Sequence, residues 1–267
     1  MAQLQLLTNL LLAAGDAPDP EGEGLHCLFT NERSSLISKH WTGTAYGKKE
    51  LVTDDIRSDS SAAYILTDDI RIIFCVSGKS YFRAIKYDEE EEEWLDEELP
   101  HYELHPEGHI TGFIGPDSRA FALFQAPSGH LVSLNDTWVS SVLHANAAIA
   151  TPIATAFVGT QLLAIYLGKD NHLRLIKQSS DGRFGEDTIF APCIFEGKLK
   201  KIRLSGDEGS QNLEAYVLTE KRGIFLVKQG AEERKSLGTV GNNGVFVPGT
   251  DAESTVLLKF LWGKIFG

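Results

Sequence analysis

Six similar units of about 45 residues follow one another along the chain, and this repeat limits the fold more than any other feature of the sequence. The clearest part of each unit is its second segment, which is apolar and strand-like. These segments are GLHCLFT (24–30), DIRIIFC (69–75), RAFALFQ (119–125), LLAIYLG (162–168), NLEAYVL (212–218) and STVLLKF (254–260). In the first five units a polar turn and two further short strands follow. Four short strands in about 45 residues are typical of propeller blades, which bury their apolar faces against one another.

The first segment of each unit is rich in small residues, as in AAYILT (62–67), ITGFIG (110–115) and IATAFVG (153–159). The innermost strands of a propeller lie close together around its axis, so small side chains suit them. The sequence therefore predicts an all-β chain in which residues 1–267 form a single six-bladed β-propeller domain.

The two ends of the sequence predict how the last blade closes. The sixth unit has a first strand (244–248) and a second strand (254–261), but it lacks an outer strand. The segment AQLQLLT (2–8) has the length and apolar pattern of an outer strand, and we expect it to complete this blade, with 9–15 as the first strand of the first unit. A secretion signal is the alternative, although no basic residue precedes the apolar run. No segment favours a helix.

The net charge of −12 argues against nucleic acid and anionic membranes as partners, because both need clustered Lys and Arg. Nine acidic residues lie between Asp88 and Glu98. We interpret this run as the solvated tip of a hairpin; a site for a cation or a basic partner is the alternative. No segment approaches the ~20 apolar residues of a membrane-spanning helix.

Three cysteines, Cys27, Cys75 and Cys193, lie far apart, and the first two belong to apolar strand-like segments. They predict reduced thiols in the core of a cytoplasmic protein. Their spacing does not predict a metal site. The three histidines of PHYELHPEGH (100–109) would need a helix to form one, and Pro106 argues against that helix.

The stretch IYLGKDNHLRLIKQ (165–178), with IATAFVG (153–159) before it, resembles a blade of the fungal fucose-specific lectins, which are six-bladed propellers. The resemblance implies sugar sites between blades. In that family an Arg on the second strand and a Glu on the third bind the sugar hydroxyls. An aromatic residue from the outer strand of the next blade covers the apolar face of the sugar.

Most of these sugar-binding residues are missing here. The Arg positions carry His26, Arg71, Phe121, Ala164, Glu214 and Val256. The Glu positions of the first five units carry Ser38, Ala84, Ser133, Leu175 and Leu226. Trp94 and Trp138 remain as outer-strand aromatics, which leaves two partial sites: Arg71 with Trp138, and His26 with Trp94. Trp41 and Trp262 are further candidates for ligand contact, with packing in the core as the alternative for each tryptophan.

A lectin-like scaffold without its sugar-binding residues leaves three classes of function. The first is a cofactor-free cyclase or cycloaddition catalyst (Diels-Alderase-like) of fungal natural-product biosynthesis, which the resemblance also implies. Arg71 or His26 would donate to a carbonyl of a hydrophobic small molecule, the tryptophans would enclose it, and no metal or cofactor is expected. A glycan-binding lectin of altered specificity is the second class, and a protein-interaction propeller is the third; oligomer formation is open in each.

Overall fold

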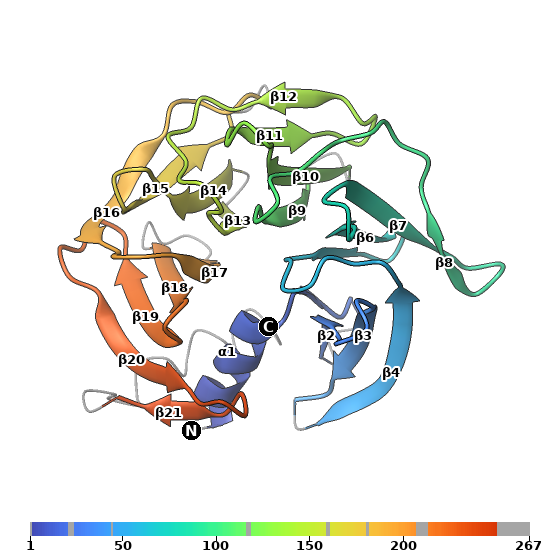
Figure 1. Cartoon of the computed structure of the whole chain (residues 1–267), viewed down its shortest axis with the longest axis horizontal. Helices are drawn as coiled ribbons and strands as arrows, with labels where there is room; N and C mark the ends of the chain where they lie inside the picture. The colour runs from blue at the N-terminus through green and yellow to red at the C-terminus, as the bar shows by residue number, and fades with distance from the viewer. Residues whose placement is uncertain are drawn as a thin grey trace. The chain divides into compact units, whose positions relative to one another are not determined.

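The computed structural model describes residues 2–20, 24–43, 45–115, 119–158, 161–179, 182–206 and 213–249 (Figure 1). These residues form one helix, α1 (Ala2–Leu12), and five sheets. Every strand pair with a defined register is antiparallel. Within this part of the chain, no helix has the length and apolar character needed to cross a membrane.

The strands of each sheet are hydrogen-bonded in chain order. The first sheet consists of β1 (Gly15–Pro18), β2 (Leu25–Thr30), β3 (Leu36–Trp41) and β4 (Tyr46–Thr53). The second consists of β5 (Ala63–Leu66), β6 (Arg71–Val76), β7 (Phe82–Asp88) and β8 (Glu93–Asp96). The third consists of β9 (Ile110–Ile114), β10 (Ala120–Gln125), β11 (Leu131–Leu134) and β12 (Ser140–Val142).

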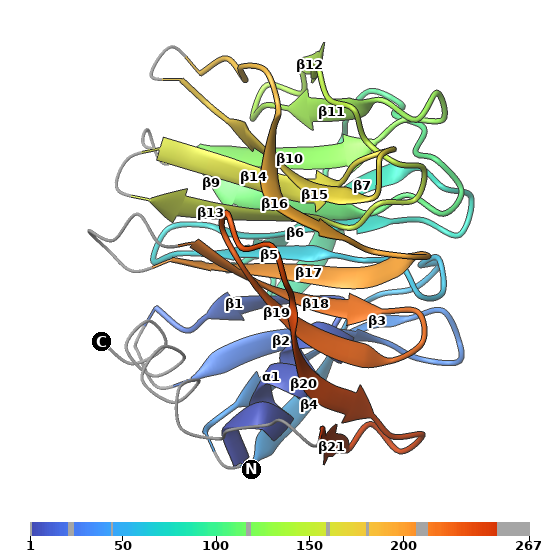
Figure 2. The same ribbon diagram turned by 90° about the vertical axis from the view of Figure 1, so that its left-hand side faces the viewer.

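The fourth sheet consists of β13 (Ile153–Val158), β14 (Gln161–Leu167), β15 (His172–Lys177) and β16 (Thr188–Ile194). The fifth consists of β17 (Leu199–Gly206), β18 (Leu213–Thr219), β19 (Gly223–Lys228), β20 (Lys235–Val240) and β21 (Phe246–Pro248) (Figure 2). The chain divides into two compact units. One holds residues 13–127 and 133–140, and the other holds α1, residues 128–132 and the described residues from 141 onward.

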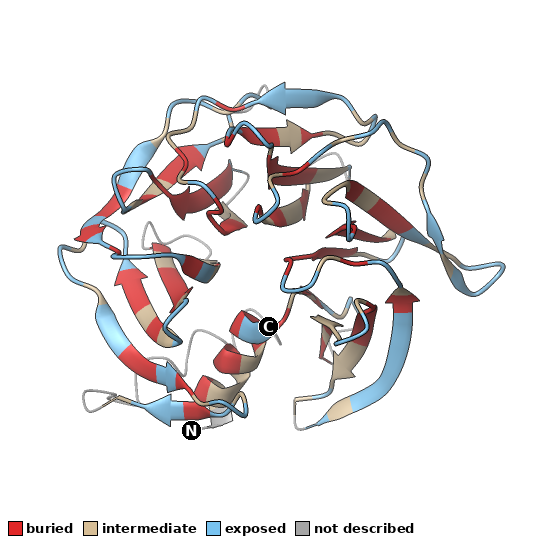
Figure 3. Cartoon of the chain, viewed as in Figure 1, coloured by how far each residue is buried: buried red, intermediate tan, exposed pale blue. Residues whose placement is uncertain are grey.

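The structure confirms the repeat of strands expected from the sequence. The predicted second segments of the first five units become β2, β6, β10, β14 and β18. Four of these strands, β6, β10, β14 and β18, are mostly buried (Figure 3), and Ile73, Phe74 and Cys75 of β6 are examples. An unbroken apolar run is what a strand covered on both faces needs. All three cysteines are buried and none of them forms a disulfide, as predicted.

Two glycines show why the first strands carry small residues. A Cβ atom at Gly15 of β1 would lie 2.3 Å from the carbonyl oxygen of Ala62, next to β5. A Cβ atom at Gly112 of β9 would lie 2.9 Å from Cδ2 of Phe74 and 3.0 Å from Cβ of Ala63, which belongs to β5. The first strands of the first three sheets therefore pack closely against one another, as the blades of a propeller require.

The N-terminal segment is a helix, which corrects the predicted outer strand over 2–8 and first strand over 9–15. The buried leucines Leu4, Leu7 and Leu11 recur at intervals of three and four residues, which puts them on one helical face. The hydroxyl of Thr8 donates 2.7 Å to the carbonyl of Leu4, one turn earlier. Because Leu, Gln and Ala are good helix formers, the short apolar alternation that suggested a strand does not decide the structure.

The helix nevertheless meets the last described strand, where the outer strand was expected. The side chain of Gln5 donates 3.1 Å to the carbonyl of Gly244 and accepts 2.8 Å from the backbone N–H of Phe246. The predicted first strand of the sixth unit (244–248) is also corrected. It supplies β21, which pairs with β20 as a fifth strand of the fifth sheet. The second strand of that unit, 254–261, lies outside the described residues.

The acidic run is a hairpin tip, as interpreted from the sequence. Strands β7 and β8 flank the turn, and residues 89–93 are exposed (Figure 3). The Asp88 carboxylate accepts the backbone N–H groups of Glu90 and Glu91 at 2.8 and 3.1 Å, which fixes the turn. Charged side chains on a short outer strand also discourage pairing with other chains.

Candidate functional site

An aromatic and charged group of side chains lies between the first and second sheets. His26 on β2 and Tyr64 on β5 have ring centroids 5.6 Å apart, and Trp94 on β8 lies 5.9 Å from Tyr64. Both contacts are edge-on, the arrangement that aromatic pairs favour. Tyr64 is buried, whereas His26 and Trp94 are half-buried. The buried ring of Tyr64 thus packs against the rings of His26 and Trp94, which remain partly accessible to solvent.

The indole of Trp94 joins the outer strands of the two sheets. Its Nε1–H donates 2.7 Å to Oε1 of Glu50 on β4. The ring of Tyr87 on β7 packs edge-on against the same indole at 5.1 Å. We call the set of His26, Glu50, Tyr64, Arg71, Tyr87 and Trp94 the inter-sheet cluster.

Arg71 begins β6 and lies over the face of Tyr87, with 4.8 Å from its guanidinium carbon to the ring centroid. Its Nη1 lies 3.3 Å from Oε1 of Glu89, with which it forms an ion pair. The arginine side chain is 39% exposed and the glutamate 72%. Ion pairs of this kind contribute at most about 1 kcal/mol to stability, so the N–H donors of Arg71 can exchange Glu89 for a ligand at little cost.

Two further residues, Asp19 and His40, extend the cluster at His26. His40 on β3 is the cross-strand partner of His26, with ring centroids 4.9 Å apart. Asp19 follows β1, and its Oδ2 lies 3.1 Å from Nε2 of His40 and 3.7 Å from Nε2 of His26. All three side chains are partly buried. The arrangement places two imidazoles around one carboxylate oxygen.

Burial and neighbouring charges set the protonation of this region. Desolvation, followed by the nearby His40, lowers the pKa of His26, although Asp19 acts in the opposite direction. Since the ordinary pKa of histidine is about 6.5, His26 is mostly neutral at pH 7. Burial raises the pKa of Tyr64 to about 12, against the opposing effect of Arg71, so its hydroxyl stays protonated.

The remaining predicted site residues lie apart from this group. Trp138 packs edge-on against Phe74 at 6.3 Å and Phe82 at 6.2 Å, whereas Arg71 contacts Tyr87 and Glu89. Within the described part of the chain, Arg71 and Trp138 thus contact different side chains, and they do not form the pair that the sequence suggested. Trp41 packs against Tyr46 with 4.8 Å between ring centroids. Trp262 lies outside the described residues.

The strand register shows what faces the positions assigned to the acidic sugar ligand in the first two units. Ser38 lies opposite Leu28, and Ala84 lies opposite Phe74, and all four side chains point into the core. The residue facing His26 is His40. Counting outward from the β2–β3 hairpin would have found this pair, because antiparallel partners stay in step on both sides of a turn. The inter-sheet partners Tyr64 and Glu50 had no comparable signal.

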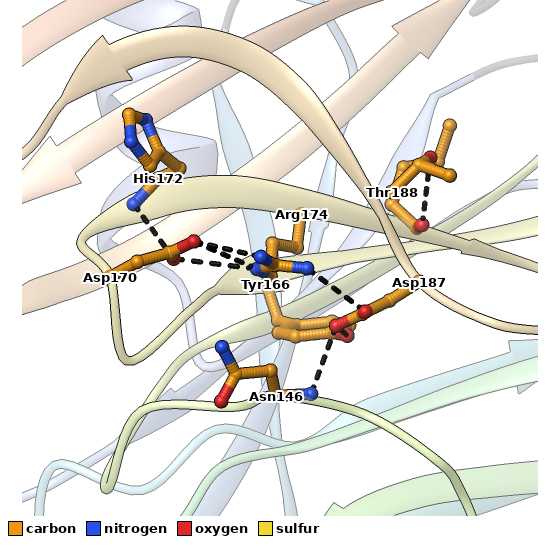
Figure 4. Close-up of polar contacts among 8 residues, drawn as sticks. Asn146, Tyr166, Asp170, His172, Arg174, Asp187 and Thr188 are labelled. Carbon is orange, nitrogen blue, oxygen red and sulfur yellow. Dashed lines mark hydrogen bonds and ion pairs between the residues drawn. The ribbon is translucent and has the colours of Figure 1, made fainter.

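The stretch 165–178 contains a second polar network, which is structural (Figure 4). Asp187 accepts the Tyr166 hydroxyl at 2.5 Å, the Asn146 backbone N–H at 2.9 Å and Nη1 of Arg174 at 2.9 Å. Asp170 binds the other side of the Arg174 guanidinium at 2.8 Å, and this bond lowers the Asp170 pKa. The guanidinium of Arg174 donates hydrogen bonds to both carboxylates, so the charged groups have their partners and the network stabilises the fourth sheet.

No protein-family model matches the sequence, and no curated protein matches it significantly. Solved structures do match. The AofleA structure from Arthrobotrys oligospora has a TM-score of 0.64 and 14% identity, over 87% of this chain and 73% of that one. The Aleuria aurantia lectin in complex with α-methyl-L-fucoside has a TM-score of 0.63 and 10% identity, over 88% and 80%. The structure of SapL1 lectin in complex with α-methyl fucoside has a TM-score of 0.59 and 10% sequence identity, over 88% of this chain and 80% of that one.

The similarity extends over most of the chain at very low identity, so it bears on the fold. One matching Aleuria aurantia lectin structure is described as a six-bladed β-propeller, with a TM-score of 0.59 to this chain. The five described sheets here, each with its strands in chain order, agree with successive blades of that architecture. The chain therefore has the β-propeller fold of the fungal fucose-specific lectins.

Proposed function

We propose that this chain is a glycan-binding protein and that the inter-sheet cluster is its sugar-binding site. The observation that carries the proposal is the meeting of Trp94, Tyr64 and Tyr87 with the accessible donors of Arg71 and His26, from two successive sheets. The solved lectins of the same fold that contain α-methyl fucoside support a sugar as the ligand.

The chemistry of the cluster suits a sugar. The C–H groups of a pyranose ring are apolar and pack on an aromatic face, which the half-buried Trp94 offers. Its hydroxyls bind charged donors and acceptors, here the guanidinium of Arg71 and the carboxylate of Glu50. Because Glu50 already binds the indole N–H, ring and acceptor are held in a fixed relation before a ligand arrives.

The specificity should differ from that of a fucose lectin. At the Arg positions of the third, fourth and fifth units stand Phe121, Ala164 and Glu214, and Ala164 is fully buried. The missing charged partners would each have contributed about 1.5–3 kcal/mol to binding. We therefore expect weak binding of free fucose and binding of a different glycan at few sites.

The other readings of the sequence stay predictions. Cyclisation of a hydrophobic metabolite by Arg71 or His26 is one, and it has less support because the structural neighbours include sugar-binding proteins. A protein-interaction role, a cytoplasmic location and a fungal origin are others. None of them is needed for the glycan proposal.

A glycan array followed by calorimetry with the best glycan tests the proposal. Trp94→Ala and Arg71→Ala should each weaken binding by about tenfold or more, which corresponds to about 1.4 kcal/mol. Matched controls are Leu95→Ala, which truncates an exposed neighbour on β8, and Arg119→Ala, which removes an exposed guanidinium elsewhere.

Unchanged binding in both control variants, together with loss in both site variants, supports the assignment. If the array shows no glycan binding, the glycan proposal is wrong. If a glycan binds with equal strength to the wild type, Trp94→Ala and Arg71→Ala, the protein is a lectin whose site lies elsewhere.

A further inference from the structure

Three metal-ligating side chains converge at the edge of the inter-sheet cluster. Asp19, His26 and His40 each offer one ligand atom, and these atoms all lie within 4.8 Å of one another. They come from the end of β1, from β2 and from β3. Among the described residues, these three form the one group of three or more metal-ligating side chains whose ligand atoms lie this close together. We propose that these three residues form a binding site for one divalent transition-metal ion, and that Zn²⁺ fits it best.

The distances suit tetrahedral coordination. Zinc bonds of about 2.0–2.2 Å to nitrogen and oxygen place neighbouring ligand atoms about 3.3 Å apart. Oδ2 of Asp19 lies 3.1 Å from Nε2 of His40 and 3.7 Å from Nε2 of His26, on either side of that value. The two ligand nitrogens lie within 4.8 Å of each other, so rotation of the rings would have to bring them closer for all three atoms to share one ion.

An unsatisfied polar atom points independently to a ligand at this place. Nε2 of His40 is shielded from solvent and makes no hydrogen bond of acceptable geometry, even though the Asp19 carboxylate is close. Buried polar atoms nearly always have a partner, so such an atom needs an explanation. A metal ion between His40 and Asp19 would give the nitrogen its partner.

The backbone around the three residues also fits a prepared site. The N–H of Asp19 donates 3.0 Å to the carbonyl of Gly24, which fixes the start of the loop that carries the carboxylate. A Cβ atom at residue 24 would lie 2.7 Å from Nε2 of His40 and 2.1 Å from the carbonyl oxygen of Trp41. Glycine at this position therefore keeps the space beside the nitrogen open.

The donor types select among metals. Two imidazoles and one carboxylate suit zinc and other first-row transition metals, whereas Mg²⁺ and Ca²⁺ prefer sites made of oxygen alone. Three protein ligands leave a fourth position for water or another ligand. The side chains of His26 and His40 are 21% and 31% exposed, so the group lies near the protein surface although Nε2 of His40 itself is shielded.

The site does not depend on the glycan proposal, because metal binding is measured without sugar. Calorimetry with ZnCl₂ on the full chain, free of any polyhistidine tag and stripped with a chelator, should show saturation at one ion per chain. MgCl₂ at the same concentrations should give no binding. Co²⁺ in place of Zn²⁺ should give the intense visible absorption of a tetrahedral site.

Variants assign the ligands. His40→Ala and Asp19→Asn should weaken Zn²⁺ binding by about 100-fold or more, because even outer partners of metal ligands change affinity by 10–100-fold. His144→Ala is the matched control, since it removes an exposed imidazole outside the group. Circular dichroism confirms that each variant is folded.

Loss of binding in folded His40→Ala and Asp19→Asn, with His144→Ala unchanged, supports the site. The proposal is overturned if the wild type shows no saturable Zn²⁺ binding. It is equally overturned if the His40→Ala and Asp19→Asn variants bind Zn²⁺ as strongly as the wild type does. In either case the three residues form only a charged contact between strands.

Discussion

The indole Nε1–H of Trp94 donates a 2.7 Å hydrogen bond to Oε1 of Glu50, across 44 positions of sequence. The bond joins β8, the outer strand of the second sheet, to β4, the outer strand of the first. The same indole contacts Tyr64 from the innermost strand of its own sheet. One side chain therefore ties together three strands of two sheets and sets the geometry of the candidate sugar site.

Arg71→Ala should leave the protein folded. The arginine is partly exposed and its partner Glu89 is largely exposed, and such surface pairs contribute at most about 1 kcal/mol to stability. We expect the free energy of unfolding in urea to fall by less than about 1 kcal/mol. Tyr64→Ala is the contrasting variant, because loss of the buried ring should lower the free energy of unfolding by about 3–5 kcal/mol. Unfolding of Arg71→Ala at room temperature would mean that Arg71 has a structural role and would remove it from the proposed site.

The helix at the N-terminus should matter for stability through its buried face. Leu7 is fully buried in α1, so Leu7→Ala should lower the free energy of unfolding by about 2–5 kcal/mol. Leu12, at the end of the same helix, is 44% exposed, so Leu12→Ala should change the free energy of unfolding by less than about 0.5 kcal/mol. Thermal melts monitored by circular dichroism would separate the two. Equal melting temperatures for both variants would contradict the packing of α1.

The network around Asp187 should stabilise the fourth sheet as a unit. Asp187→Ala leaves the Tyr166 hydroxyl and the Asn146 N–H without their acceptor and deprives Arg174 of one partner. The expected loss is on the order of 3 kcal/mol in urea unfolding. Tyr166→Phe removes one donor only and should cost about 1 kcal/mol. A smaller loss for Asp187→Ala than for Tyr166→Phe would show that Asp187 does not hold the network together.

Alkaline pH should destabilise the protein through its buried thiols. Burial raises the pKa of Cys75 from its ordinary value of 9.0 to about 12. A group whose pKa is higher in the folded chain contributes its stability fully below the unfolded pKa and loses it as pH rises toward the folded pKa. The window therefore runs from pH 9.0 to about 12. Within it the free energy of unfolding should fall by up to about 1.4 kcal/mol per pH unit for this thiol.

Urea titrations between about pH 8 and about pH 10 test this dependence; unfolded tyrosines also begin to titrate in this range, and comparison with a Cys75 variant cancels their contribution. The Cys75→Ala variant should show a shallower decline over the same range. Its absolute stability differs because of the smaller side chain, so the slopes are compared. Identical slopes for the variant and the wild type would show that Cys75 does not titrate in the unfolded chain as argued.

The sequence predicted the strands well, whereas its site residues stay predictions. The third segments of the first five units, such as YFRAIKY (81–87), were placed correctly, because a strand's apolar pattern and its turn residues are local. His26 and Trp94 were predicted to share a partial site, and the structure places both on Tyr64. Asp19 and His40 were missed. The motif alignment drew attention to Ser38, whereas the strand register pairs His26 with His40.

The sequence by itself determined the all-β repeat, the small residues of the first strands and the burial of the cysteines. These features follow from interactions between residues close in sequence and from which side chains avoid water. The tertiary structure decided that residues 2–12 are helical, because only packing of Leu4, Leu7 and Leu11 separates a short apolar helix from a strand. It also decided that Trp94 meets Glu50, because contacts between sheets depend on how whole sheets pack, which no local pattern encodes.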